Sequence, residues 1–146
     1  MNKTIIFDFY RTIFDPESSK LVPGTKTVLK SLKRRGFRLF LVSREEKSRK
    51  ELIQSLGISD TFEQILLVPQ KTAADFLNIL STQKISLKNS FVVGDRVKEE
   101  IALGNQIGLT TIWVKTGKFS TEIPRTQTER PTFTVTKLKD ILKVLK

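Results

Sequence analysis

The sequence has 146 residues, of which 26 are Lys or Arg and 15 are Asp or Glu, so its formal net charge is +11 at pH 7. It contains no cysteine and no histidine, which excludes disulfides, thiolate or imidazole metal sites, and catalysis by Ser-His-Asp or Cys-His groups. The remaining acids and bases are chiefly carboxylates and lysines, so any metal chemistry would use a cation that prefers oxygen ligands.

The chain length is typical of one domain of about 100–200 residues, so we expect residues 1–146 to form a single domain. The apolar run that begins at Ile5 stops at Asp8, too early for a secretory leader, and no run is long enough to span a bilayer. We therefore expect a cytoplasmic protein without membrane contacts. The basic residues are scattered along the chain, which favours a solvated basic surface over a dedicated nucleic-acid face and leaves the latter as the alternative.

Short apolar runs rich in β-branched and aromatic residues recur along the chain and predict strands. The first run, at 4–7, is continuous rather than alternating, which is typical of a parallel strand covered on both faces. In chain order, the expected strands are 4–7, 37–42, 65–68, 90–93, 110–114 and a short one at 133–135.

Helical periodicity fills most of the intervals between these runs. The expected apolar faces are Val28, Leu29 and Leu32 before Gly36; Leu52, Ile53 and Leu56 in a helix over 45–56; Ala73, Ala74, Leu77 and Leu80; a helix over 98–107; and Leu138, Ile141, Leu142 and Leu145. The polar segment 117–132, which contains two prolines, is expected to be a surface loop. This alternation predicts an α/β fold, a single Rossmann-like three-layer domain whose parallel sheet has five strands or slightly more.

Ligands of such sheets bind beyond the carboxyl ends of the strands, so the residues at those ends are the candidates for a site. Asp8 and Asp95 each follow an apolar strand, and their carboxylates converge on a Mg²⁺ site if the two strands are neighbours. Ser43 follows the second strand and Lys71 precedes the helix after the third, and both can hold phosphoryl oxygens. Singly, each residue has an ordinary structural explanation, but four suitable types at the ends of different strands favour a functional site.

Four segments resemble the motifs of the haloacid dehalogenase superfamily. Residues 5–15 are similar to its first motif, Asp-x-Asp-Gly-Thr, and residues 23–43 to the segment that ends in its second-motif Ser or Thr. Lys71 lies where the third-motif lysine is expected, and Gly94-Asp95 with a following acid resembles the fourth motif. The resemblance covers most of the chain, and it implies a small member without a sizeable cap domain, because the connections after the first and third strands are short.

The resemblance implies a Mg²⁺-dependent phosphohydrolase. Asp8 would attack phosphorus and become an aspartyl-phosphate. Mg²⁺ would be held by Asp8, the main-chain carbonyl of Tyr10 and Asp95, with Glu100 as the further acid that orients Lys71 or a metal-bound water. Glu99 is the alternative to Glu100.

The expected phosphate- and substrate-binding residues lie in the same loops. Ser43 and Lys71 would hold the transferring oxygens, and Phe9, Arg11 and Arg44 would contact substrate. A site without a cap is open, so the phosphorylated substrate is either a small molecule or a macromolecule, with a nucleic-acid end as one alternative.

Two positions depart from the family pattern. Tyr10 stands where the second Asp of the first motif acts as general acid and base, and Arg11 stands where the family usually has Gly. A phenol, with an ordinary pKa of about 10, can donate a proton but is a poor base at neutral pH. Three interpretations follow: a slow phosphatase whose aspartyl-phosphate persists, a phosphatase that recruits another acid such as Asp15, or a binding module for metal, phosphate, RNA or protein that has lost turnover.

A phospho-receiver domain is a further alternative with the same kind of sheet. It fits less well, because its phosphorylated Asp is expected after the third strand, and here that strand ends in Val68-Pro69.

Overall fold

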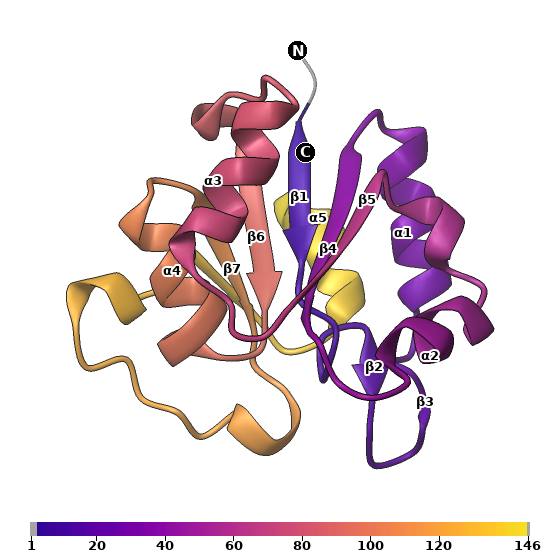
Figure 1. The fold of residues 1–146 in the computed structure, drawn as a ribbon. Helices are drawn as coiled ribbons and strands as arrows, with labels where there is room; N and C mark the ends of the chain where they lie inside the picture. The colour runs from indigo at the N-terminus through magenta and orange to yellow at the C-terminus, as the bar shows by residue number, and fades with distance from the viewer. Residues whose placement is uncertain (1–2, 146) are drawn as a thin grey trace.

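The computed structural model describes residues 3–145. In this part of the chain, six parallel strands form one sheet in the order β5-β4-β1-β6-β7-β8 (Figure 1). Their bounds are β1 Thr4–Phe7, β4 Arg38–Arg44, β5 Gln64–Val68, β6 Ser90–Gly94, β7 Thr110–Val114 and β8 Phe133–Val135. All six strands expected from the sequence are therefore confirmed.

The centre of the sheet positions the two aspartates that follow strands. β1 pairs with β4, Thr4 opposite Arg38, and with β6, Thr4 opposite Ser90. The amide of Asp8 donates to the carbonyl of Val93 at 3.0 Å, so the pairing of β1 with β6 continues one residue past β1. These two strands are therefore neighbours, which meets the condition for a shared site, and the pairing brings Asp8 beside the end of β6.

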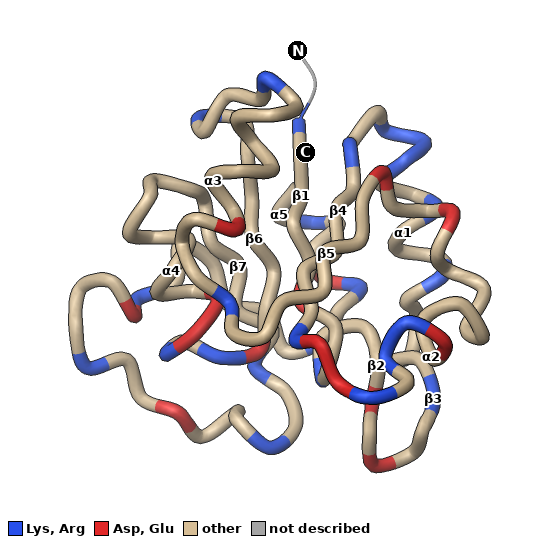
Figure 2. The backbone as a smooth tube through the Cα atoms, viewed as in Figure 1, with Lys and Arg blue, Asp and Glu red and all other residues tan. Residues whose placement is uncertain are grey.

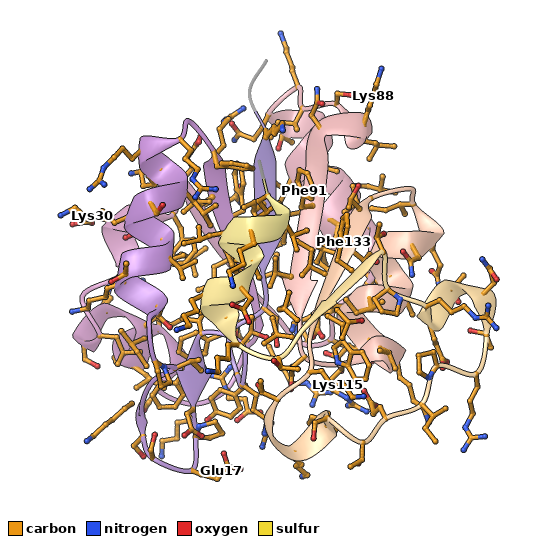
Figure 3. The ribbon with its side chains drawn as sticks, turned by 180° about the vertical axis from the view of Figure 1, so that it is seen from behind. Glu17, Lys30, Lys88, Phe91, Lys115 and Phe133 are labelled. Atoms are coloured by element: carbon orange, nitrogen blue, oxygen red, sulfur yellow. The ribbon has the colours of Figure 1, made fainter. Side chains whose placement is uncertain are left out.

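Helices cover both faces of the sheet, which confirms the three-layer α/β fold. Their bounds are α1 Thr25–Arg34, α2 Arg49–Ser55, α3 Ala73–Thr82, α4 Ala102–Gln106 and α5 Ile141–Val144. The core on the α1 and α5 side contains Ile5, Phe7 and Ile141, whereas the core under α3 contains Ile6, Phe40 and Phe76. Seen from behind, α5 lies across the sheet near Phe91 (Figure 3). Among the described residues, no helix is long and apolar enough to cross a bilayer.

A small hairpin that the sequence did not predict follows β1. It consists of β2, Phe14–Asp15, and β3, Lys20–Leu21, paired antiparallel. Strands of two residues are too short to show an alternating pattern, so sequence periodicity cannot reveal them.

Two helix predictions need correction. The helix expected over 45–56 begins only at Arg49, because the amide of Glu45 still bonds to the carbonyl of Val68 and Ser48 has a left-handed backbone with φ +65°. The apolar stripe expected on α3 is right only at Leu80: Ala74 and Leu77 are exposed, and the buried face consists of Phe76, Ile79 and Leu80. The larger side chains, spaced at i, i+3 and i+4, bury more apolar surface against the sheet than the alanines would.

The two remaining helices are divided rather than continuous. The helix expected over 98–107 begins as a π-helical turn, η3, Val97–Ile101, and continues as α4. The C-terminal helix consists of a short 3₁₀ turn, η6, Leu138–Asp140, followed by α5. The π turn matters for the site, because it carries Glu99 and Glu100.

Candidate active site

The predicted site residues gather at the carboxyl edge of the sheet, where Figure 2 shows charged positions of both signs. Asp8 follows β1, Ser43 lies near the end of β4, and Asp95 follows β6. Lys71 comes from the loop before α3 and Glu100 from η3. These five side chains line one cleft of about 270 Å³.

Three of them form a buried acidic cluster. Asp8, Asp95 and Glu100 each place one carboxylate oxygen within 4.8 Å of the other two. They are 5%, 2% and 2% exposed, respectively. The ammonium of Lys71 donates to Asp8 Oδ1 and, at 2.6 Å, to Glu100 Oε1. One lysine therefore faces three buried carboxylates, and the cluster is short of positive charge.

The pKa values of the clustered carboxyls reflect this shortage of positive charge. Burial, together with the charges of Asp8 and Glu100, raises the pKa of Asp95 to about 9. Burial and the charge of Asp8 raise the pKa of Glu100 to about 8. For Lys71, burial opposes the charged form, but attraction by Asp8 and Glu100 outweighs it and raises the pKa. Both carboxyls thus resist ionisation until further positive charge enters the cluster.

The donor set fits Mg²⁺. Asp95 Oδ2 and Glu100 Oε2 are buried and have no hydrogen-bond partner among the described residues, and unpaired buried carboxylate oxygens are costly without a cation. Mg²⁺ prefers oxygen ligands and is commonly bound by one or two carboxylates. Trp113 Nε1 donates to the main-chain carbonyl of Asp95 at 2.9 Å and fixes the loop that carries it.

Of the two glutamates considered, Glu100 is the buried one, whereas Glu99 is half-buried and its carboxylate lies 3.8 Å from Lys71. A Cβ at Gly94 would lie 2.8 Å from Glu100 Cβ and Oε2. The glycine at the end of β6 is therefore required for Glu100 to approach Asp95.

Arg49 is a residue of this cleft that the sequence interpretation missed. It is 4% exposed, and its Nη1 donates to Ser43 Oγ at 2.6 Å and to the carbonyl of Arg44 at 3.2 Å. Its guanidinium lies 4.0 Å from the centre of the Tyr10 ring. The sequence held one signal for it: Arg49 precedes Ile53 by four residues, so a helix places this cation on its apolar face.

Comparison with known proteins agrees with this geometry. The model of the HAD-hydrolase-like family matches residues 69–141, half of the chain, including Lys71, Asp95 and Glu100. The chain belongs to this family. The match lies in the half that carries the third and fourth motifs, and the resemblance drawn from the sequence is confirmed.

Among the relatives of this HAD-family chain are two proteins named glyceraldehyde 3-phosphate phosphatase. The one from Pyrococcus furiosus is 26% identical over 130 residues, and the one from Pyrococcus abyssi is 30% identical. Each alignment covers 85% of this chain but 54% of the relative, so the chain spans about half the length of these proteins.

Solved structures agree on the fold. An uncharacterized protein from Listeria monocytogenes superimposes with a TM-score of 0.78 at 20% identity, covering 98% of this chain and 96% of that one. A 2-haloacid dehalogenase from Pseudomonas syringae also gives 0.78, at 16% identity over 99% and 98% of the two chains.

The positions where this HAD-family chain departs from the usual first motif lie at the mouth of the cleft. Tyr10 and Arg11 are half-buried and both line it, as does the exposed Arg44. Phe9, expected to contact substrate, is instead fully buried and stacks on Phe14 with ring centres 5.3 Å apart, so its side chain belongs to the core. Asp15, considered as a substitute acid, is not among the residues lining the cleft; its carboxylate accepts bonds from Ser18 and from the amide of Glu17.

Proposed function

We propose that this chain is a cytoplasmic, Mg²⁺-dependent phosphohydrolase that cleaves phosphate monoesters through an aspartyl-phosphate on Asp8. The observation that carries the proposal is the buried cluster of Asp8, Asp95 and Glu100 around Lys71 at the carboxyl edge of the sheet. The relatives named as phosphatases support the same reaction type.

The first step is an in-line displacement at phosphorus. A carboxylate oxygen of Asp8 forms the new bond to phosphorus, and the bond from phosphorus to the ester oxygen breaks. Lys71 and the hydroxyl of Ser43 hold the phosphoryl oxygens. Asp8, the carbonyl of Tyr10, Asp95 and Glu100 would hold Mg²⁺, whose charge offsets the repulsion between the Asp8 carboxylate and the phosphate.

The leaving oxygen must take up a proton, and Tyr10, which lines the cleft, carries a phenol that can donate one. A phenol that has given up this proton can return to its neutral form from solvent, but it does not efficiently deprotonate the water that hydrolyses the aspartyl-phosphate. We therefore propose that hydrolysis of this intermediate is slow and limits turnover.

The test is Mg²⁺-dependent hydrolysis of p-nitrophenyl phosphate by the wild type, Asp8→Asn and Tyr10→Asp. We expect a burst of about one equivalent of p-nitrophenol from the wild type, followed by a slow steady rate, and neither phase from Asp8→Asn. Tyr10→Asp should raise the steady rate by up to about 10²-fold, because a positioned carboxylate acts as acid and base.

Two outcomes contradict the proposal. Activity that survives in Asp8→Asn would exclude Asp8 as the nucleophile. Activity that appears only in Tyr10→Asp would show that the natural chain is a binding module without turnover.

A further inference from the structure

A second cavity adjoins the catalytic cleft and is more than twice as large. Its volume is about 620 Å³, against about 270 Å³ for the cleft. Small-molecule sites usually occupy about 300–1,000 Å³. The second cavity lies within this range and the cleft just below it, so a substrate too large for the cleft has room to extend into the second cavity. Its walls come from the β2–β3 hairpin and from the chain that follows β7 and β8; Glu17, on the hairpin, lies at the lower edge of Figure 3.

Arg11 is the residue that the two cavities share. Its aliphatic part lies against Gly117 of the second cavity, where a Cβ would be 3.9 Å from Arg11 Cδ. Its guanidinium lies 5.2 Å from the ring centre of Phe119, which lines the cleft. A molecule that extends from one cavity into the other must therefore pass Arg11.

The guanidinium of Arg11 has unused hydrogen-bonding capacity. Its Nε is buried without a partner, and no carboxylate of residues 3–145 lies within ion-pairing distance of it. The backbone of Arg11 is also left-handed, with φ +63°, a conformation that disfavours every residue with a side chain. A strained position that holds an unpaired cation between two cavities points to a ligand that supplies the missing acceptor.

The lining of the second cavity suits an organic ligand with both apolar and polar parts. Val22 and Leu138 give it apolar walls, and Lys137, Lys139 and Glu17 bring charged groups to its rim. Apolar walls with a few polar groups are typical of small-molecule sites.

We propose that the second cavity binds the leaving group of the substrate, and that the substrate is a phosphomonoester of about nucleotide size whose oxygen atoms accept hydrogen bonds from Arg11. The assignment rests on the phosphohydrolase function proposed above and adds the substrate class. The phosphoryl group lies at Asp8, the ester body passes Arg11, and its far end lies between Val22 and Leu138.

The test compares phosphomonoesters whose leaving groups increase in size, from 2-glycerol phosphate through ribose 5-phosphate to adenosine 5′-monophosphate. The wild type should show kcat/KM at least 10-fold higher for the nucleotide than for glycerol phosphate. Thr136→Trp fills the second cavity from an exposed position and should remove this preference, chiefly by raising KM for the nucleotide. Thr134→Trp makes the same change at an exposed position that lines neither cavity and should preserve the preference.

Arg11 is tested by two substitutions. Arg11→Gly removes the guanidinium and relieves the left-handed strain, so it should lower kcat/KM for the nucleotide about 10-fold relative to glycerol phosphate without loss of thermal stability. Arg11→Lys should restore part of the difference. A size series that is flat in the wild type, or a preference that Thr136→Trp leaves intact, overturns the assignment.

A binding measurement tests the assignment of the second cavity independently of the proposed phosphohydrolase reaction. Calorimetric titration of adenosine 5′-monophosphate and of inorganic phosphate into the wild type with Mg²⁺ needs no turnover. If no ester is hydrolysed but the nucleotide binds at least 10-fold more tightly than phosphate, and Thr136→Trp abolishes that difference, the cavity assignment stands and the phosphohydrolase proposal fails. If esters are hydrolysed but the two probes bind with equal affinity, the reaction stands and the cavity assignment fails.

Discussion

At the scale of single residues, the site consists of buried charged side chains that have few partners of opposite charge. Arg49 illustrates this, because its nearest carboxylate, Glu46, is exposed and 3.5 Å away. A buried guanidinium that bonds Ser43 Oγ in the same cleft as Lys71 is placed to hold Ser43 and to attract a phosphoryl group.

We expect Arg49→Gln to raise KM for a phosphomonoester and the inhibition constant of inorganic phosphate by roughly 10- to 150-fold, the effect of losing one charge-assisted hydrogen bond of about 1.5–3 kcal/mol. Arg49→Lys should recover part of the loss, because it keeps the charge without the planar fork. Steady-state kinetics with phosphate as inhibitor measure both constants. Glu46→Gln is the control, since it changes only the exposed partner, and an equal effect there would contradict a role in phosphate binding.

We predict that replacing Asp95 changes the stability of the metal-free protein. Burial and the neighbouring charges raise the pKa of Asp95 to about 9, so at pH 7 the metal-free fold must keep this carboxyl protonated although the unfolded chain ionises it. Asp95→Asn puts a neutral side chain there and removes this cost. The metal-free variant should therefore unfold at a higher urea concentration than the metal-free wild type.

Mg²⁺ should affect the two proteins differently. At a free concentration 100 times its dissociation constant it should stabilise the wild type by about 2.7 kcal/mol and Asp95→Asn far less. Urea unfolding with Mg²⁺ and with EDTA measures this, with Asp60→Asn, an exposed position, as the control. An equal response of all three proteins to Mg²⁺ would show that Asp95 is not a ligand.

At the scale of elements, the π turn and α4 depend on close contact with the sheet. A Cβ at Gly104 of α4 would lie 2.5 Å from Val92 Cγ1 of β6 and 2.9 Å from Thr111 Cγ2 of β7. The glycine thus sets the distance between α4 and the strands, and with it the position of η3 and Glu100.

Gly104→Ala should destabilise the protein although alanine favours helices. The propensity gain is about 1 kcal/mol, whereas forcing a methyl group into a packed core costs about 1–3 kcal/mol. We expect a net loss of about 1 kcal/mol, seen as a lower urea midpoint. Gln106→Ala, at an exposed position of the same helix, controls for propensity alone; a gain in both variants would show that α4 has room to move.

Sequence periodicity predicted an element well where its own residues determine it and poorly where contacts with other elements determine it. The continuous apolar strands were placed to within two residues, because burial on both faces leaves no other pattern. The start of α2 was misplaced because the bond from Glu45 to Val68 joins residues that are distant in sequence. The buried face of α3 was misplaced because Phe76 competes for the same core as the residues that the pattern assigned to it.

At the scale of the whole molecule, the net charge of +11 is spread over a surface whose acidic residues are partly withdrawn into the site. Lys and Arg positions lie along much of the chain in Figure 2 rather than in one stripe. Such a distribution attracts polyanions by their charge and does not distinguish one nucleotide sequence from another.

We therefore expect single-stranded RNA to bind weakly, with a dissociation constant of about 10⁻⁴–10⁻⁶ M at physiological salt. Affinity should fall steeply as salt is raised and should not change in Asp8→Asn, because the surface charges and not the cleft make the contacts. Fluorescence anisotropy over a salt series measures this. Nanomolar, sequence-dependent binding that persists at high salt would instead reveal a dedicated nucleic-acid face.

The sequence by itself determined the α/β class and the order of the strands along the chain, and it predicted four groups of the candidate site, because apolar runs and the residues that end them are local features. Only the tertiary structure decided that Glu100 rather than Glu99 is buried with Asp95, that Arg49 holds Ser43, and that Phe9 belongs to the core. It also joined the chain after β1, β7 and β8 into a cavity that shares Arg11 with the cleft. These features depend on how the elements pack in three dimensions, and even the short-range contacts of Arg49 with Ser43 and of Phe9 with Phe14 exist only in the packed molecule.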